Sequence, residues 1–342
     1  MSHFLKKLFL FLALQAVVFA VLFHLAQSVV NPYIRTLRAK HRHLAASPKP
    51  RLILVGGSGL SFGIQSDLLQ AGLPAYTPAN LGLHAGMGLD FILADALREV
   101  ERGDLVLLCL EFEIWPVQRG TVEQWEGLLC RPGTAAGLNP RWLTDDGLGF
   151  VSHVTQRALK ALRKNQPSSP IDDLFSDHSF NATGDFVGHR TLPPFRPMLD
   201  GDSHSTEPLG CEDLSQLPTV REFVAACESR GARVVIFFPP IPTPLFELHR
   251  ADVVEYVARQ RAAFGDRVLG RLEDIPTDEN LFFDGINHLT WAGGARRTRA
   301  IIERLKSADI PPPSREPSTT IAPFFHRTTS GRLMLRQMKL PR

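Results

Sequence analysis

The stretch that decides the fold is Arg51-Leu-Ile-Leu-Val-Gly-Gly-Ser-Gly-Leu-Ser-Phe-Gly63, in which an apolar run leads directly into a glycine-flanked serine. A short apolar run that ends at glycine is typical of a buried strand. The glycines allow a sharp turn and leave backbone N–H groups free to face an anion. Near the other end, Asp284-Gly-Ile-Asn-His288 supplies a carboxylate and a histidine. We therefore predict that Ser58 is a nucleophile, that His288 is its base and that Asp284 orients the histidine.

Apolar runs of strand length alternate with helical patterns along most of the chain. Such alternation predicts right-handed βαβ units, and hence an α/β fold with a parallel sheet covered by helices on both faces. The expected strands span residues 51–57, 75–81, 104–111 and 232–238, with a weaker one at 267–270. The expected helices span residues 62–71, 87–101, 217–230, 247–264 and 291–306, and Thr290 is the expected N-cap of the last one.

The N-terminal residues differ in character from the rest. The segment Leu8 to Val30 is about as long as the roughly 20 apolar residues that a membrane-spanning helix needs. A cleaved signal peptide is the alternative, but the run exceeds the usual apolar core of about 7–15 residues. Residues 1–43 contain six Lys or Arg and no acid. We therefore assign residues 1–43 to a single membrane anchor with a basic juxtamembrane segment.

The charges are segregated along the sequence. The formal net charge is +3, but both ends are basic and the residues between them carry an excess of acid. An acidic body argues against nucleic acid as a ligand, whereas basic ends beside an apolar segment suit anionic lipid headgroups. Four basic residues at positions 35–42 outnumber Lys6 and Lys7 on the other side of the span. The positive-inside rule, taken alone, would then keep the body in the cytoplasm.

One α/β domain is expected over residues 44–308. It contains a loop-rich insertion at 165–216, whose many Pro, Asp, Ser and Gly residues are typical of a lid or a partner surface. Residues 309–342 begin with a run of prolines and have no clear periodicity, which predicts a basic, Pro-rich tail.

The four cysteines have no metal-ligand spacing, and no metal or organic cofactor is expected. Cys109 and Cys227 lie in patterns typical of inert core thiols. Cys130 and Cys211 lie in loop-rich sequence and could form a disulfide if the domain is exported, so their state remains open.

Polar residues follow several of the expected strands. Because the carboxyl ends of parallel strands meet at one edge of a sheet, these residues should lie close together. Ser58 follows the first strand, Asn80 to Gly88 the second, and Glu111 and Glu113 the third, while His288 precedes the last helix. Glu111 and Glu113 are expected to hold neighbouring loops through backbone N–H groups rather than to act as an acid–base pair.

These blocks resemble those of the SGNH/GDSL hydrolase superfamily. Gly56-Gly57-Ser58 is similar to the first block, residues 80–88 to the second, and residues 284–288 to the last, with one residue more than the commonest Asp-x-x-His spacing. The resemblance implies a flavodoxin-like three-layer αβα fold with a parallel sheet.

The resemblance also implies the remaining site residues. The Gly86 N–H would join the Ser58 N–H in an oxyanion hole, and Gly57 and Asn80 would belong to the same site. His84 lies in the second block and either faces the site or is a structural histidine. Where the superfamily usually presents Gly-x-Asn-Asp, this chain has Glu111, which when ionised only accepts hydrogen bonds and so cannot replace the Asn donor.

The relatives that the chain most resembles are membrane-anchored SGNH-like proteins of bacterial envelope-polymer modification. They work outside the cytoplasmic membrane beside a multi-spanning O-acyltransferase. This implies that Ser58 accepts an acyl group, acetyl by expectation, and passes it to a hydroxyl of a surface or exopolysaccharide; with water as acceptor the protein is an esterase. The implied location is the bacterial inner membrane with the domain in the periplasm. The positive-inside rule, from the charges that flank the span, predicts the opposite orientation.

Two other functions remain open from the sequence. One is a catalytically silent SGNH-like subunit that binds or assembles polysaccharide, which the altered third block would favour. The other is a membrane-bound lipid esterase that faces the cytoplasm, which the flanking charges would favour.

Overall fold

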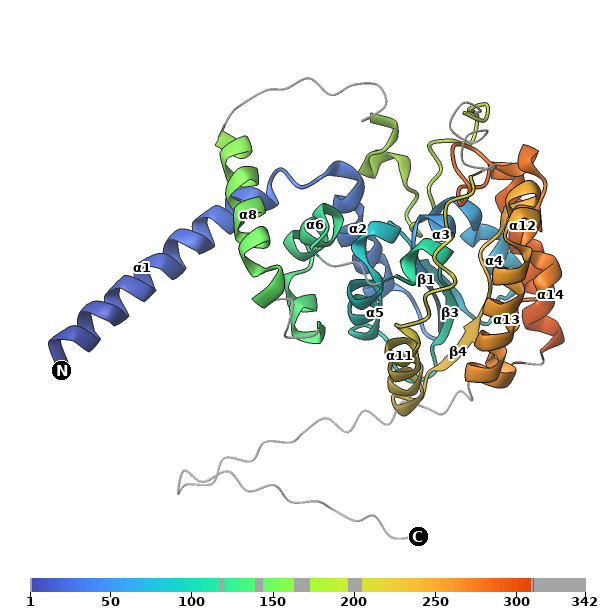
Figure 1. Ribbon diagram of the computed structural model, residues 1–342, viewed down its shortest axis with the longest axis horizontal. Coiled ribbons are helices and arrows are strands. Elements are labelled where there is room, and N and C mark those ends of the chain that lie inside the picture. Colours follow the sequence, from blue (N-terminus) through green and yellow to red (C-terminus); the bar gives the residue numbers. More distant parts are fainter. Residues whose placement is uncertain are drawn as a thin grey trace, which may run out of the picture. The chain divides into compact units, whose positions relative to one another are not determined.

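The computed structural model describes residues 2–116, 120–138, 144–162, 173–195, 205–308 and 310 (Figure 1). The expected tail at 309–342 therefore lies outside the described residues, apart from Ile310. Two parts of the expected insertion, residues 165–172 and 196–204, also lie outside them.

A parallel sheet of four strands forms the centre of the fold, in the order β2-β1-β3-β4. Its strands are β1 (Arg51–Gly56), β2 (Thr77–Asn80), β3 (Leu105–Cys109) and β4 (Arg233–Ile236). Leu54 of β1 lies between Asn80 of β2 and Leu107 of β3. The expected α/β class with a parallel sheet is confirmed. The fifth expected strand, at 267–270, is reduced to one parallel bridge between Val268 and Ile236.

Both faces of the sheet are covered by helices. Successive side chains of a strand point to opposite faces, so the apolar residues of each strand pack against helices on both sides. Ile53 and Val55 of β1 belong to a core with residues of α5, α11 and α13, whereas Leu52 and Leu54 pack with residues of α4 and α14. These helices are α3 (Ser58–Gly63), α4 (Ser66–Gly72), α5 (Leu89–Leu97), α11 (Leu217–Ser229), α12 (Thr243–Leu248), α13 (Arg250–Phe264) and α14 (Trp291–Ser307). A small parallel pair, β5 (Ile241–Pro242) and β6 (Pro276–Thr277), lies outside the main sheet.

The first helix, α1 (Ser2–Gln27), is the one helix of the described residues that is long and apolar enough to cross a membrane, over His3–Gln27. Its N-terminal two thirds expose large apolar side chains, and its last residues join the body. Ala26 is fully buried, and Gln27 Nε2 donates to the Leu129 carbonyl at 2.8 Å.

The second helix, α2 (Pro32–Ala46), corrects the expected domain boundary. It begins at an N-cap, because the Asn31 side chain accepts from the Tyr33 N–H at 2.9 Å. Six of its seven buried residues are Tyr33, Ile34, Leu37, Lys40, His41 and Leu44. The segment predicted to be a basic juxtamembrane face is therefore packed against the α/β body, which begins at α2 rather than at residue 44.

Among the described residues between β3 and α11 lie the helices α6 (Val122–Cys130) and α8 (Gly147–Leu162). Short 3₁₀ turns connect the larger elements: η1 (Ala85–Met87), η2 (Phe112–Ile114), η3 (Pro132–Gly137), η4 (Asp177–Ser179), η5 (Gly265–Arg267), η6 (Leu272–Asp274) and η7 (Glu279–Leu281). All four cysteines are buried free thiols, so Cys130 and Cys211 do not form the disulfide that the sequence left open.

Candidate active site

Ser58, His288 and Asp284 form one hydrogen-bonded chain. Ser58 is the first residue of α3 and follows β1 after a single glycine, Gly57. Its Oγ lies 2.8 Å from His288 Nε2, and His288 Nδ1 lies 2.6 Å from Asp284 Oδ1. In the tautomer that fits, Nδ1–H donates to the carboxylate and Nε2 accepts the serine proton. This is the arrangement that activates a serine hydroxyl for attack on a carbonyl carbon.

The loop that carries Asp284 and His288 accommodates the unusual spacing. The Phe283 N–H donates to the His288 carbonyl at 2.7 Å, and the His288 N–H donates to the Gly285 carbonyl at 3.3 Å. These bonds close a tight loop in which residues four apart still pair. Phe62 of α3 then stacks on the imidazole, with ring centroids 4.0 Å apart and an angle of 9° between the planes. The base is thus held from two sides.

Glu111 lies beneath the nucleophile and binds the backbone on both sides of it. Its Oε2 accepts from the Gly57 N–H at 2.9 Å, and its Oε1 accepts from the Gly59 N–H at 2.6 Å. A Cβ at Gly57 would lie 2.7 Å from this carboxylate, so a larger residue there would displace Glu111. Burial raises the pKa of Glu111, with the charge of Glu113 as the next cause. The prediction that Glu111 holds a loop through backbone N–H groups is confirmed, and it offers no donor to an oxyanion.

A second carboxylate links the third and last blocks. Asn287 Nδ2 donates to Glu113 Oε2 at 2.6 Å. Asn287 was not predicted as a site residue, although it precedes His288 in the sequence. The bond fixes the loop of the base to the loop that carries Glu111.

Several residues of the second block are engaged in hydrogen bonds with their own loop or with neighbouring loops. Asn80 Nδ2 donates to the Leu60 carbonyl at 3.0 Å and to Asp185 Oδ1 at 3.0 Å. The Gly86 N–H donates to His84 Nδ1 at 3.0 Å, so it is engaged within its own turn and is not free to join the Ser58 N–H as an oxyanion donor. Burial lowers the pKa of His84. Because the first N–H groups of a helix lack intrahelical partners, the Ser58 N–H at the start of α3 is the donor that this geometry offers to an oxyanion.

Lys40 of α2 ties several parts of the site together, which the sequence did not predict. Its buried ammonium donates to the Gly82 carbonyl at 2.6 Å, the Asn80 carbonyl at 3.1 Å and Ser61 Oγ at 3.2 Å, and also to the Gly184 carbonyl. Burial lowers the pKa of Lys40 to about 7. A basic pattern alone gave no sign of this role, since only tertiary packing distinguishes Lys40 from the surface cations nearby.

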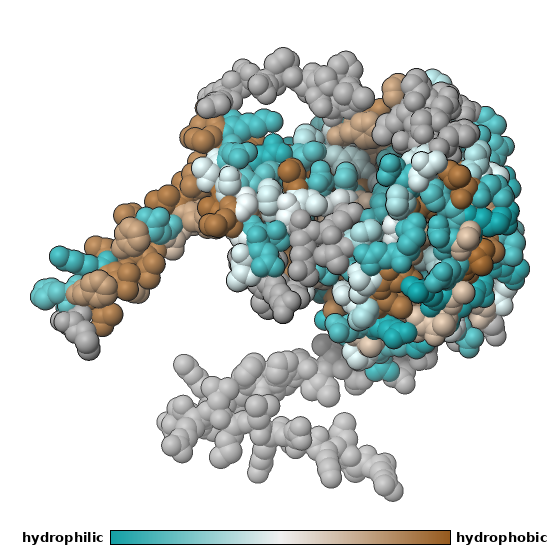
Figure 2. Space-filling model, viewed as in Figure 1, coloured by the Kyte–Doolittle hydropathy of each residue, from teal (hydrophilic) through white to brown (hydrophobic). Residues whose placement is uncertain are grey.

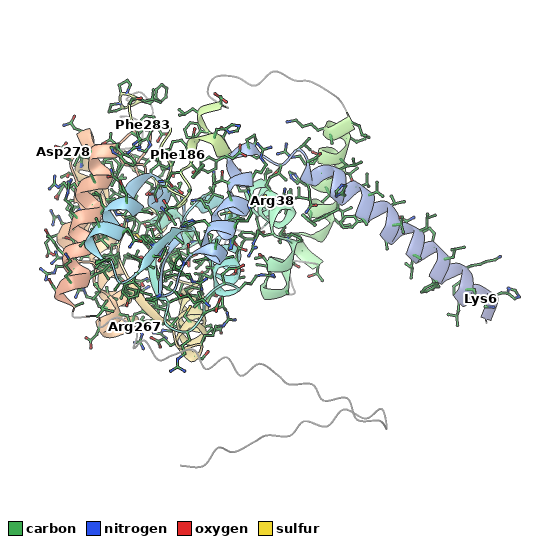
Figure 3. The ribbon with its side chains drawn as sticks, turned by 180° about the vertical axis from the view of Figure 1, so that it is seen from behind. Lys6, Arg38, Phe186, Arg267, Asp278 and Phe283 are labelled. Atoms are coloured by element: carbon green, nitrogen blue, oxygen red, sulfur yellow. The ribbon has the colours of Figure 1, made fainter. Side chains whose placement is uncertain are left out.

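Residues 173–195 of the expected insertion form a wall of the site. Phe186 is fully buried and stacks on Phe62 at 4.2 Å between ring centroids, and Figure 3 shows it close to Phe283. His189 Nε2 donates to the Leu289 carbonyl at 3.1 Å, and burial lowers the pKa of His189 to about 4. Residues 173–195 are therefore packed against the catalytic loops, while part of this segment remains exposed, and its role as a lid or a partner surface stays a prediction.

A cavity of about 770 Å³ lies next to the site but does not contain it. Its lining includes Leu289 and Arg297 of α14, and neither Ser58 nor His288. Arg297 donates to the Gly59 carbonyl at 3.0 Å and to Cys109 Sγ at 2.9 Å, and so separates the cavity from the nucleophile. We place the chemistry at Ser58, because the hydrogen-bonded chain lies there.

One group of side chains in the described residues could share a cation. Ligand atoms of Glu212, His249 and Asp252 lie within 4.8 Å of one another. The two carboxylates are exposed, and His249 Nε2 already bonds the Ser205 carbonyl at 3.1 Å. The group shares no residue with the Ser58 site.

No family model matches this chain. A search of curated proteins also finds no match. The interpretation of the site therefore rests on its geometry and on the sequence blocks that surround it.

Proposed function

We propose that this protein is an SGNH-type serine acyltransferase or esterase that acts on O-acyl groups, acetyl above all, of a bacterial cell-surface or exopolysaccharide. The observation that carries the proposal is the hydrogen-bonded chain from Ser58 through His288 to Asp284. A binding module or scaffold has no need for a serine, a histidine and a carboxylate in this order and at these distances.

The topology supports the SGNH assignment. The strand order β2-β1-β3-β4, with Val268 bridged to the outer edge of β4, follows the flavodoxin-like order 2-1-3-4-5. The nucleophile follows the first strand, and the acid–base pair precedes the last helix, α14. Both positions are those of the corresponding blocks in the superfamily that the sequence resembles.

In the first half of the reaction, Ser58 is acylated. Its Oγ attacks the carbonyl carbon of an acyl donor, and the hydroxyl proton moves to His288 Nε2. Asp284 keeps the imidazolium oriented, and the Ser58 N–H stabilises the tetrahedral oxyanion. The bond from the carbonyl carbon to the leaving group then breaks, and His288 returns the proton to that group. An acyl ester on Ser58 remains.

In the second half, an acceptor hydroxyl takes the acyl group. His288 removes the proton from a sugar hydroxyl, whose oxygen attacks the ester carbonyl of the acyl-Ser58, and the proton returns to Ser58 Oγ as the acyl bond breaks. A water molecule as acceptor releases the free acid by the same steps. The described groups perform this cycle with no metal or organic cofactor.

We place the protein in the bacterial inner membrane, anchored once by α1, with the catalytic domain in the periplasm. A multi-spanning O-acyltransferase is the proposed source of acyl groups. The charge count opposes this orientation, although two of the cations counted have roles in the folded domain. Lys40 is buried in the body, and Arg35 pairs with Asp177 at 2.8 Å. These two cations serve the packing of α2, so their presence after the span has a structural reason independent of orientation.

A second candidate is a catalytically silent SGNH-like subunit that binds polysaccharide. The observation in its favour is the engagement of the Gly57, Gly59 and Gly86 N–H groups by Glu111 and His84. Loss of a single oxyanion donor costs about 10²–10³ in rate elsewhere.

Turnover of an acetyl ester separates the candidates. The full chain in lipid nanodiscs would be mixed with an acetylated oligosaccharide, and acetate release and transfer to an unmodified oligosaccharide would be followed by mass spectrometry. The proposal expects both products, or acetate alone, and their loss in Ser58→Ala. Binding of the oligosaccharide by both forms without turnover would instead establish the silent subunit. A C-terminal reporter that is active only in the periplasm would confirm the orientation, and one active only in the cytoplasm would favour a lipid esterase.

A further inference from the structure

The helix α8 presents three different faces. One face is buried against the protein through Phe150, His153, Val154 and Ala158. A second face is apolar and exposed, with exposed fractions of 87% for Leu148, 44% for Val151, 48% for Leu159 and 64% for Leu162. At 3.6 residues per turn, these four residues lie in a stripe along one side of the helix, together with Thr155, whose hydroxyl donates to the Val151 carbonyl at 2.9 Å. The third face carries the exposed polar residues Ser152, Gln156 and Lys160. A surface helix in contact with water has no need of the second face.

The apolar stripe belongs to the helix that packs along the membrane-anchor candidate α1. The Phe23 ring of α1 lies 6.4 Å from the Phe150 ring of α8, edge to face, and Phe19 and Leu22 pack against the same core. Figure 1 shows α8 beside the end of α1 that joins the body, and Figure 2 shows hydrophobic residues both along α1 and on the adjoining surface. The helix that carries the exposed stripe therefore packs on the end of the anchor that joins the body.

The length of α1 sets the depth of this contact. A bilayer core of about 30 Å takes about 20 helical residues. Counted from Leu8, the first residue after Lys6 and Lys7, such a span ends near Gln27. The α1 residues that contact the body begin at Phe19, so they fall within about the last 12 Å of the span, at 1.5 Å per residue. The helix that packs on them must lie at the level of the near leaflet.

We propose that the stripe formed by Leu148, Val151, Leu159 and Leu162 inserts into the near leaflet of the bilayer, so that α8 is a second, interfacial membrane contact. The inference rests on the anchoring proposed for α1. Lipid is the favoured partner because α8 packs directly on the anchor helix and because the apolar side chains of the stripe offer no hydrogen-bonding group to a specific ligand.

This contact has a consequence for the active site. The hydrogen bond from Gln27 to the Leu129 carbonyl fixes the end of α1 to α6, and the bond from the Asn31 N–H to Glu126 Oε2 at 2.9 Å fixes the start of α2 to the same helix. Two membrane contacts on one rigid frame hold the domain at a set tilt, which a single anchor with a free joint would not do. Ser58 would then be held at a fixed distance from the lipid surface.

Fluorescence of single labelled positions tests the inference on the full chain in vesicles of phosphatidylethanolamine and phosphatidylglycerol. The variants Leu148→Cys and Leu159→Cys would carry an environment-sensitive nitrobenzoxadiazole dye on the stripe, and Gln156→Cys is the matched control on the polar face of the same helix. The four native cysteines are buried, which keeps background labelling low. Leu12→Cys in α1 reports on the anchor itself.

We expect both stripe positions to be quenched by nitroxide-labelled lipid and to be about tenfold less quenched by aqueous iodide than Gln156→Cys, in line with the preference of a leucine-sized side chain for an apolar phase. Iodide access at the stripe with a protected Leu12→Cys would overturn the inference while leaving the anchor standing. Protection from iodide without quenching by lipid nitroxide would mean that a protein covers the stripe, and would also overturn it. Exposure of Leu12→Cys would contradict the anchor and the inference together.

Discussion

The substitution Glu111→Gln tests how the nucleophile is held. The two carboxylate oxygens of Glu111 each accept one backbone N–H, from Gly57 and from Gly59. A glutamine of the same shape has only one acceptor oxygen, so in either orientation its NH₂ group faces an N–H donor. One of the two bonds beside Ser58 must break, and the turn that carries the hydroxyl must shift.

Two effects on folding oppose each other in this variant. Loss of a hydrogen bond to a charged group costs about 1.5–3 kcal/mol of the free energy of unfolding. Against this, the variant no longer buries a charge, and burial already raises the pKa of Glu111, which shows that its ionised form is unfavourable there. We expect a net loss of no more than about 2 kcal/mol.

The effect on reactivity should be much larger. A displacement of a reacting atom by about 1 Å can cost about 10²-fold in rate. We therefore expect the rate of covalent labelling of Ser58 by a fluorophosphonate to fall about 100-fold in Glu111→Gln, while urea unfolding shows a folded protein. The matched control is Glu113→Gln, whose Oε1 can still accept from Asn287 and which should label within a few-fold of the native rate. Native labelling of Glu111→Gln would refute the role given to this carboxylate.

The pH dependence of stability gives a second, independent test of the buried Glu111 carboxyl. Because the pKa of Glu111 is raised in the folded state, the folded form binds this proton more readily than the unfolded form. The contribution of the protonated Glu111 carboxyl to the free energy of unfolding is therefore fully present below the ordinary carboxyl pKa. It is lost as pH rises through the pKa that Glu111 has in the folded protein. Since glutamine does not titrate, the stability gap between the native protein and Glu111→Gln should narrow as pH rises through this range.

Three further predictions concern Asp284, which orients the base, His189 in the wall of the site, and the buried Lys40. Asp284→Asn should lower turnover or labelling by about 10⁴-fold, because an amide donor would force the wrong tautomer on His288; a loss under tenfold would contradict the proposed chain. Burial lowers the pKa of His189 to about 4, so protonation should lower the free energy of unfolding by up to about 3 kcal/mol as pH falls from 6.5 to 4. Urea unfolding of His189→Gln should show no such decrease over the same pH range. Lys40→Met should destabilise the fold by about 2–4 kcal/mol, since it removes the donor shared by several buried oxygens, and an unchanged urea midpoint would disprove that role.

The sequence predicted the central sheet well, because its strands are buried on both faces and read as continuous apolar runs. Leu52 to Val55 and Leu105 to Cys109 are examples. The helix α2 was missed for the opposite reason. Its buried face includes Lys40 and His41, and the pKa of His41 is raised where its ring meets Asp95 and Glu99, so a charged pattern concealed a packed helix.

The candidate site divides in the same way. Ser58, Asp284 and His288 could be predicted, because their chemistry and their places at strand and helix ends are visible in the sequence. The role of Glu111 followed from the fact that a carboxylate only accepts hydrogen bonds. The engagement of the Gly86 N–H by His84 could not be predicted, since it depends on one side-chain rotamer. The wall that contains Phe186 also depends on tertiary packing, to which local sequence gives no guide.

The central claim is that Ser58 is an activated nucleophile, and covalent labelling by a fluorophosphonate probe tests it most directly. The native chain, Ser58→Ala and His288→Ala would be treated in native membranes and again after purification, and the adduct would be located by mass spectrometry. The account predicts an adduct on Ser58 that is lost in both variants. A folded native protein that carries no adduct on Ser58 in either setting would contradict it.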